Sequence, residues 1–307
     1  RAVEVKSSVF KRDLSFVDVP RPAVGERDLL VRVHVATVSR GDAVMLRMPK
    51  LLARLFGETP KSVLGQEFAG EVESVGSAVE AFQPGNRVFG TTTGLVQGSH
   101  AELLRIPSDA IVTSIPPGVD YEHAAAVPVG AMTALHFLDA SALAHGDRAL
   151  INGASGGVGI YAVQIARIRG ARVTGVAGPS NLELIRELGA EQVIDYTAQS
   201  LADLDDEFDV VFDVAGTTSA RDSKHLLSPD GRFVTTQARR SDTLGELQQV
   251  RQLLAEGLLK TVVDRRFNLA EVSSAFDHIK AGSNSGGVLI KVRCWSPLCR
   301  PWRSSRG

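Results

Sequence analysis

The sequence predicts an α/β protein built from a β-rich first domain and a doubly wound parallel sheet. Two observations lead to this fold class. Over residues 1–117, short stretches of alternating apolar residues are broken by glycine and proline, which is typical of a small irregular barrel or sandwich. From Arg148 onwards, apolar strands alternate with segments that carry apolar residues at helical spacing, which indicates repeated βα units and a parallel sheet.

The β-rich part comes first, and its strands are expected at 14–19, 29–35, 67–75, 87–90 and 101–106. Turns are expected at Arg21-Pro22 and at Pro84-Gly85-Asn86, and residues 50–61 are expected to form a loop or a short helix. Asp42 follows a turn, where a carboxylate most often caps backbone N–H groups, so we expect a structural role for it. Three histidines have no partner at a catalytic spacing and are expected to be structural or exposed: His34, His100 and His123.

A break at Pro116-Pro117-Gly118 separates this part from two expected helices, at 121–127 and from Pro128 to Leu138. A strand from Arg148 then leads into a loop in which Gly153, Gly156 and Gly159 lie three residues apart. Because glycine has no Cβ, this loop can turn sharply, approach a pyrophosphate and pack a helix closely on the sheet. The N–H groups and dipole at the helix start then favour phosphates.

The helix after the loop is expected to end at Gly170, and a second strand at 172–176 completes a βαβ unit. A glycine pattern alone is weak evidence, and a strand, turn and helix without a ligand is the alternative. In this context the loop predicts a Rossmann dinucleotide-binding sheet.

The ends of the next strands indicate the cofactor. In NAD-preferring folds an acidic residue at the end of the second strand binds the ribose hydroxyls and repels a 2′-phosphate. Here the sequence is Ala177-Gly178-Pro179-Ser180-Asn181, which leaves room and offers hydrogen-bond donors. NADPH is therefore expected, with at least a tenfold preference over NADH, or about 1.4 kcal/mol. Ser180 and Glu183 also match a capping box, which is the structural alternative for that serine.

The remaining elements continue the parallel sheet. A third strand is expected to end at Tyr196, and a fourth at 208–214 ends in the small-residue turn Ala215-Gly216-Thr217, where a ligand can approach the backbone. Asp213, inside this strand, is expected to be structural. After a turn at Pro229-Asp230-Gly231, the expected order is a fifth strand at 232–236, a helix at 244–255, a helix through Ile279 and a final strand to Val292.

Two stretches carry a family resemblance. The segment from Gly65 to Gly76, followed by the segment from Phe82 to Gly90, resembles the chaperonin-10-like (GroES-like) domain of the medium-chain dehydrogenase/reductases, which precedes a Rossmann domain. Zinc alcohol dehydrogenases of this superfamily carry a cysteine near Ser39 and Gly-His-Glu where this chain has Gly65-Gln66-Glu67. Glu67 alone cannot hold zinc, so the sequence resembles the zinc-independent quinone oxidoreductase branch.

The resemblance implies a site. It implies that Thr133 lies near the nicotinamide and Tyr196 near the adenosine; the alternatives are a helix hydroxyl bonded to a preceding carbonyl and an aromatic side chain at a sheet edge. No catalytic residue and no metal ligand is assigned. The predicted cofactor-binding residues are Ser155, Gly156, Gly157, Val158, Gly178, Ser180, Asn181, Tyr196, Ala215 and Thr133.

The resemblance also implies domain limits. Residues 1–118 and 264–292 are expected to form the GroES-like substrate domain, residues 119–263 the Rossmann domain, and residues 293–307 a disordered tail. The family usually has a longer connection than the one that follows Thr236, so the usual homodimer is left open.

Composition excludes several function classes. The 307 residues include 34 basic and 35 acidic side chains, so no field of one sign points to nucleic acid. No run of about 18 apolar residues predicts a membrane span, and no signal peptide is expected. The two cysteines, Cys294 and Cys299, lie near the end of the chain, and a cytoplasmic location is expected.

These observations predict a zinc-independent, NADPH-dependent oxidoreductase that transfers hydride to a quinone, an enone or another electron-poor carbonyl compound. An enoyl or alkenal reductase is the first alternative. A second is an NADPH-binding protein with weak or no catalysis, as in the related zeta-crystallins. RNA binding, known in relatives, gains little support from the near-neutral charge.

Overall fold

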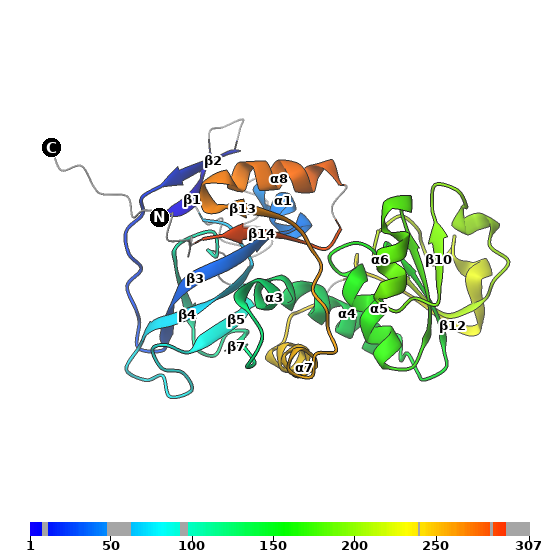
Figure 1. Cartoon of the computed structure of the whole chain (residues 1–307), viewed down its shortest axis with the longest axis horizontal. Coiled ribbons are helices and arrows are strands. Elements are labelled where there is room, and N and C mark those ends of the chain that lie inside the picture. Colours follow the sequence, from blue (N-terminus) through cyan, green and yellow to red (C-terminus); the bar gives the residue numbers. More distant parts are fainter. Residues whose placement is uncertain (8–11, 48–62, 93–97, 239, 283–284, 293–307) are drawn as a thin grey trace.

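The structure is a computed structural model that describes residues 1–7, 12–47, 63–92, 98–238, 240–282 and 285–292. Figure 1 shows two lobes, with β3, β4 and β5 in one and the strands from β8 to β12 in the other. The expectations for residues 50–61 and for the tail at 293–307 lie outside the described residues. In the described chain, no helix is long and apolar enough to cross a membrane.

The first lobe is built on a mixed sheet of seven strands among the described residues. Its order is β13 (Val263–Asn268), β14 (Gly287–Lys291), β3 (Asp28–Val38), β4 (Glu67–Val75), β5 (Arg87–Thr91) and β7 (Val112–Ser114), with β6 (Leu103–Pro107) also paired to β3. A separate hairpin pairs β1 (Ala2–Ser7) with β2 (Arg12–Val17). The five strands that the sequence predicts are all present, and β1 and β7 are additional.

The carboxyl-terminal part of the chain returns to this lobe. Strand β14 lies antiparallel to β3, with Val288 opposite Val38. Helix α8 (Val272–Ala281) packs on the same sheet, and helix α1 (Arg40–Arg47) contacts α8. Buried Phe68 and Phe276 belong to the apolar core between these elements. The expected carboxyl-terminal helix and strand are therefore confirmed.

One of the two predicted turns in this lobe is wrong. The chain does not turn at Arg21-Pro22 but at Glu26 and Arg27. There the carboxylate of Asp28 accepts the backbone N–H of Gly25 at 3.0 Å, and the N–H of Asp28 donates to the Gly25 carbonyl at 3.1 Å. This reciprocal pair fixes the turn at a position that has no proline.

The second lobe contains a parallel sheet of five strands among the described residues. The order is β10 (Gln192–Asp195), β9 (Arg172–Ala177), β8 (Arg148–Asn152), β11 (Phe208–Asp213) and β12 (Leu227–Thr235). Strand order reverses beside β8, which makes the carboxyl ends of β8 and β11 the switch point where ligands bind in doubly wound sheets. Helices α4 (Pro128–Ala140), α5 (Gly159–Ile168), α6 (Leu182–Glu187) and α7 (Leu244–Ala255) complete it, whereas α3 (Tyr121–Ala126) packs against β3 and β4 of the first lobe.

Pro229-Asp230-Gly231 lie inside the range of β12, but residues 228–231 leave the register with β11 just before Arg232, where the sequence predicts a turn. Phe208 pairs with Leu227, whereas the next pair is Val210 with Arg232. The extra residues of β12 form a bulge against β11. A Cβ at Gly231 would lie 2.8 Å from the Phe208 carbonyl oxygen, so this glycine lets the bulge stay against its neighbour.

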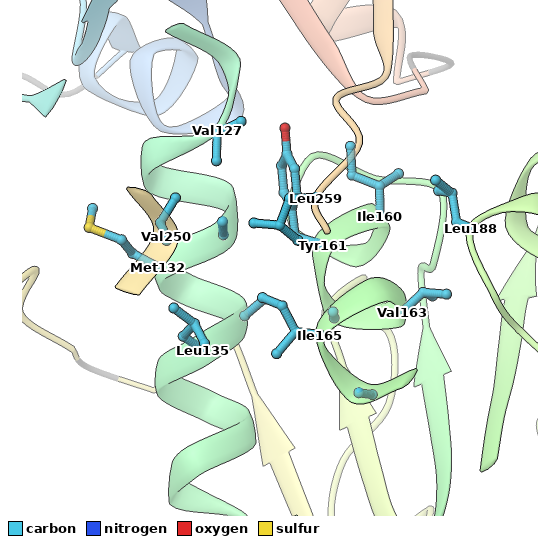
Figure 2. Close-up of a cluster of buried hydrophobic side chains, with 14 of the residues drawn as sticks. Val127, Met132, Leu135, Ile160, Tyr161, Val163, Ile165, Leu188, Val250 and Leu259 are labelled. Carbon is cyan, nitrogen blue, oxygen red and sulfur yellow. The ribbon is translucent and has the colours of Figure 1, made fainter. Parts of the chain in front are cut away.

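Helices α4 and α5 pack face to face at the centre of the molecule (Figure 2). Met132 and Leu135 of α4 and Ile165 of α5 belong to this core, which is buried almost completely. The Tyr161 hydroxyl donates to the Ala126 carbonyl at 3.0 Å, which ties α5 to the end of α3. A Cβ at Gly130 would lie 2.3 Å from the Gly157 carbonyl oxygen, so this glycine brings α4 against the glycine loop.

Candidate functional site

A cavity of about 1080 Å³ lies at the carboxyl edge of the parallel sheet and extends to the first lobe. The glycine loop, the turn after β11 and the chain after β10 line it on one side. The end of β3, the start of β4 and the first turn of α4 line it on the other. Six predicted cofactor residues from the Rossmann lobe line it, together with Thr133: Ser155, Gly156, Gly157, Val158, Tyr196 and Ala215.

The glycine loop has the geometry that its spacing predicts. Gly153 has φ +83°, a conformation that L side chains rarely adopt, and a Cβ there would also lie 2.9 Å from the Ala215 amide nitrogen. A Cβ at Gly159 would lie 2.1 Å from the Gly153 carbonyl oxygen, so α5 can begin close to the loop only with glycine. Gly157 has no heavy atom within 4 Å of where its Cβ would stand. No side chain of the described residues caps α5 at Val158, and although the N–H groups of Ile160 and Tyr161 donate to loop carbonyls, the start of the helix stays open to a ligand.

The turn after β11 is held by Asp213, which is fully buried. Its carboxylate accepts the Asn152 side-chain amide at 2.9 Å and the Gly216 backbone N–H at 3.1 Å. The Asn152 amide also donates to the Thr217 hydroxyl at 2.9 Å. These bonds join the ends of β8 and β11 and fix the small-residue turn on the cavity wall. The structural role predicted for Asp213 is confirmed.

Three predicted residues at the end of β9 do not line the cavity: Gly178, Ser180 and Asn181. The Asn181 side-chain oxygen accepts the Ser285 hydroxyl at 2.7 Å, so the segment before β14 reaches this end of the sheet. The capping box predicted at Ser180 and Glu183 is wrong, because α6 begins after Asn181 and has no side-chain cap.

Tyr196 and Gly178 lie beside one another. Tyr196 is 63% exposed and lines the cavity, and a Cβ at Gly178 would lie 3.1 Å from its hydroxyl oxygen. The structure thus brings these two predicted residues together at the outer end of the cavity.

Thr133 lies in α4, where the structure shows the helix hydrogen bond and a place in the cavity lining. Its hydroxyl donates to the Val129 carbonyl at 2.6 Å, the helix bond given as the alternative, and its side chain lines the cavity.

Sequence reasoning missed a buried group on the other side of the cavity. Glu67, the first residue of β4, is only 6% exposed and accepts the Thr37 hydroxyl at 2.5 Å and the Val129 backbone N–H at 2.8 Å. Burial raises the pKa of the Glu67 carboxyl to about 7, with a smaller rise from the charge of Asp42, against the lowering effect of the two hydrogen bonds. Both Thr37 and Glu67 line the cavity.

The sequence offers only a faint sign of this pair. A threonine at the end of a strand and the Gly-x-Glu of the Gly65-Gln66-Glu67 stretch are common features. The contact itself joins residues 30 positions apart, and local patterns carry no information about it.

Asp42 is structural, as predicted. Its carboxylate accepts both the backbone N–H and the hydroxyl of Ser39 at 2.8 Å, next to the start of α1. Burial raises the pKa of Asp42, while the charge of His100 and the bonds from Ser39 lower it in part.

The three single histidines lie away from the cavity lining, as far as the structure describes it. His34 stacks on Tyr121 with ring centroids 4.2 Å apart, His100 Nε2 lies 2.8 Å from the Thr37 carbonyl oxygen, and His123 pairs with Asp120. Their expected structural or surface roles agree with these contacts. His225, which the sequence reasoning did not single out, lines the cavity instead.

The positions that correspond to zinc ligands in zinc alcohol dehydrogenases both line the cavity, as Ser39 and Gln66. Neither side chain is a thiolate or an imidazole. In the described part of the chain, no three histidine, cysteine, aspartate or glutamate side chains converge to hold a metal ion.

Comparisons with known proteins agree with this architecture. Residues 25–117 match the family described as alcohol dehydrogenase GroES-like domain, and residues 157–261 match the family described as zinc-binding dehydrogenase. A chloroplastic quinone-oxidoreductase homolog from Spinacia oleracea is 30% identical, over 91% of this chain and 94% of that protein. The 2-methylene-furan-3-one reductase of Solanum lycopersicum is 31% identical, over 89% of this chain and 74% of that protein.

A solved structure, that of the quinone oxidoreductase from Coxiella burnetii, matches with a TM-score of 0.80 at 25% identity, over 95% of this chain and 98% of that chain. The predicted fold class is thereby confirmed, as a GroES-like domain joined to a Rossmann-like domain. The chain belongs to the medium-chain dehydrogenase/reductase superfamily, in its quinone oxidoreductase-like branch, and is an oxidoreductase.

Proposed function

We propose that this protein is a zinc-independent reductase that uses NADPH to reduce a quinone or another electron-poor carbonyl compound. The observation that carries the proposal is the composition of one cavity, in which the glycine loop faces hydroxyl and amide side chains of the GroES-like lobe. A cofactor held by the loop and a substrate held by the other lobe would meet there. We also propose that residues 1–118 and 264–292 form the GroES-like substrate domain and residues 119–263 the Rossmann domain.

The residues present fit a pyridine dinucleotide, which the family implies. The open space at Gly157 and the uncapped start of α5 support pyrophosphate binding by Ser155, Gly156, Gly157 and Val158. The Gly156 N–H donates to the Gly153 carbonyl at 3.1 Å and shapes the turn, so the amides of the other three would face the phosphates. Ala215 and Thr133 would border the nicotinamide half, and Gly178, Ser180, Asn181 and Tyr196 the adenosine half. When bound, the cofactor supplies the hydride, while the protein supplies position and walls that exclude water.

The preference for NADPH rests on the end of β9. Gly178 stands where an acidic residue would bind the ribose hydroxyls and repel the 2′-phosphate. Glu67 and Asp222, the acidic side chains of the described cavity lining, come from other segments.

Zinc independence rests on the chemistry of the donor set. Ser39 and Gln66 present a hydroxyl and a carboxamide, whereas zinc in proteins is held by thiolate, imidazole and carboxylate groups. Polarisation of a substrate carbonyl would then depend on hydrogen bonds from side chains of this chain.

Two acceptor classes are favoured by the relatives. The quinone oxidoreductases among the relatives support a quinone as the first candidate for this protein. The 2-methylene-furan-3-one reductase of Solanum lycopersicum supports an enone as the second candidate. Turnover on matched quinones and enones separates the two.

The test is the rate of NADPH oxidation by the purified protein with a panel of quinones and enones, repeated with NADH and after treatment with a zinc chelator. We expect turnover with at least one acceptor, faster with NADPH, and unchanged by the chelator. Tight NADPH binding without oxidation by any acceptor would instead support the catalytically weak binding protein. Activity that is lost with the chelator and restored by zinc would contradict zinc independence.

A further inference from the structure

Two side chains of the GroES-like lobe form a continuous hydrogen-bonded path to the cavity. Thr37 lies near the end of β3 and Glu67 begins β4, on neighbouring antiparallel strands. The Thr37 hydroxyl and the Glu67 Oε2 atom are 2.5 Å apart, and both residues line the cavity. Both are nearly inaccessible, with exposed fractions of 3% and 6%. Both ends of this hydrogen bond therefore belong to the cavity wall.

The bonds to Glu67 determine where its proton can reside. Oε1 accepts the backbone N–H of Val129 at 2.8 Å, and an amide can only donate. In the acid form the proton is therefore placed on Oε2, which then donates to the Thr37 oxygen. The hydrogen of the Thr37 hydroxyl is thereby released from Glu67 and can point into the cavity. This arrangement is that of a donor chain whose last hydrogen is available at the cavity wall.

We propose that Thr37 and Glu67 form a proton relay that protonates the substrate oxygen when hydride is transferred. The inference rests on the proposed function. Hydride addition reduces the quinone or carbonyl compound and oxidises the dihydronicotinamide, which leaves negative charge on the substrate oxygen. The Thr37 O–H bond breaks as the new substrate O–H bond forms, and the Thr37 oxygen takes the proton of Glu67. Glu67 remains as a carboxylate and regains its proton from water.

The electrostatic surroundings of Glu67 suit a group that gives up and regains a proton near neutral pH. Burial and the nearby Asp42 of α1 raise its pKa to about 7, while Thr37 and Val129 lower it. Tyr161 of α5 interacts with its charge, and the Nε2–H of His100 donates to the Thr37 carbonyl oxygen at 2.8 Å. Arg40 of α1 lines the same cavity. A proton donor is most effective when its pKa lies near the working pH.

A second hydroxyl and carboxyl pair, Ser39 with Asp42, does not have this character. Ser39 lines the cavity, but Asp42 does not. The Ser39 hydroxyl donates to Asp42 and also accepts the backbone N–H of Asp42 at 3.2 Å. These reciprocal bonds close the pair on itself as a cap at the start of α1.

Four variants test the relay in the full chain. Glu67→Gln keeps the shape and removes the proton donor, Thr37→Val removes the hydroxyl, and Thr37→Ser restores it. Thr174→Val removes another buried threonine hydroxyl, on β9 away from the cavity lining, and serves as the matched control.

The first measurement is the pH profile of kcat for NADPH oxidation by the best acceptor, in water and in deuterium oxide. We expect kcat of the unaltered protein to fall above about pH 7, because Glu67 then lacks its proton. Glu67→Gln and Thr37→Val should lower kcat by at least about tenfold, with smaller changes in KM. In both variants, the fall of kcat above pH 7 and the solvent isotope effect should disappear. Thr37→Ser should recover most of the rate, and Thr174→Val should behave as the unaltered protein.

The second measurement needs neither cofactor nor turnover. Infrared difference spectra of the cofactor-free protein between pH 5 and pH 9 should contain the C=O band of a protonated carboxylic acid, with a midpoint near 7, that Glu67→Gln abolishes. Thr37→Val should shift this band, because the acid loses its acceptor.

The outcomes separate the two proposals. If the unaltered protein oxidises NADPH and the Glu67 and Thr37 variants keep its rate and pH limb, the relay is wrong and the proposed function stands. If no acceptor of the panel supports NADPH oxidation by the unaltered protein, the proposed function is contradicted instead. Absence of a band that depends on Glu67 overturns the relay whatever the turnover.

Discussion

At the scale of single residues, two glycines of the same loop make opposite demands. A Cβ at Gly159 would collide with the Gly153 carbonyl, whereas a Cβ at Gly157 would meet no protein atom within 4 Å. The fold therefore requires glycine at position 159. At position 157 the fold does not require glycine, but the approach of a ligand to the backbone would. The spacing of the glycines predicts the loop but does not separate these roles.

Substitution of Gly157 tests the predicted pyrophosphate site directly. We expect Gly157→Ala to keep the melting temperature within about 2 °C, since the methyl group has space. Its NADPH affinity should fall by about tenfold, or about 1.4 kcal/mol, because the methyl group stands where the phosphates approach the backbone. Calorimetric titration measures the affinity. Gly245→Ala in α7, away from the cavity lining, is the control, and unaltered affinity in Gly157→Ala would exclude a pyrophosphate at this position.

The proposed preference for NADPH also rests on one residue. Gly178 has φ −76° and ψ 162°, an ordinary extended conformation, so an aspartate adds no backbone strain. We expect at least a tenfold preference for NADPH in kcat/KM, and a reversal toward NADH in Gly178→Asp, because the carboxylate repels a 2′-phosphate. Gly178→Ala places a Cβ at the same distance from Tyr196 without the charge, and should keep the preference. Equal use of both cofactors by the unaltered protein would contradict this account.

At the scale of elements, agreement between sequence and structure depends on how local the determining contacts are. Helix α7 spans residues 244–255 as predicted, because its cap and its apolar spacing depend on residues within or next to the helix itself. Strand β12 begins earlier than predicted, because Leu227 pairs with Phe208 before residues 228–231 leave the register and pairing resumes at Arg232. The contacts from Val129 to Glu67 and from Ser285 to Asn181 in the site join segments that are distant in the sequence, so no local pattern predicts them.

The amino-terminal cap of α7 is a local device whose contribution can be measured. The Thr243 hydroxyl accepts the Glu246 backbone N–H at 3.1 Å, and the Glu246 carboxylate accepts the Thr243 N–H at 3.1 Å. We expect Thr243→Ala to lower the free energy of unfolding by about 1 kcal/mol, and Thr243→Ser, which retains the oxygen, to lower it far less. Urea denaturation provides the comparison. Equal stability of the alanine variant would mean that packing of α7 alone fixes its start.

At the scale of the whole molecule, hydrogen bonds between distant segments hold the two walls of the cavity together. The Gly286 N–H donates to the Ser155 carbonyl at 3.1 Å, and the Ser285 hydroxyl bonds to Asn181. Glu67 accepts the Val129 N–H from the other side. The two walls are thus tied at both ends of the cavity, and the charge state of Glu67 bears on a contact between the lobes as well as on chemistry.

That charge state should also appear in the pH dependence of stability. The folded protein holds a proton on Glu67 up to about pH 7, whereas the unfolded chain releases it near 4.5. Between these values the folded state binds more protons, so the free energy of unfolding falls as pH rises, by up to about 3 kcal/mol, and is level above 7. Asp42, whose pKa is also raised by burial, acts in the same direction.

Glu67→Gln should flatten this slope, because the carboxamide resembles the acid form at every pH. Its stability relative to the unaltered protein should therefore rise between pH 4.5 and 7 in denaturant titrations. Glu73→Gln is the control: burial raises the pKa of Glu73, but the bonds and charges of Arg21 and Arg32 outweigh this and lower it. Its contribution is lost only as pH falls below about 4.5, so this variant should keep the slope between 5 and 7. An equal slope in Glu67→Gln and the unaltered protein would mean that Glu67 is ionised throughout this range in the folded state.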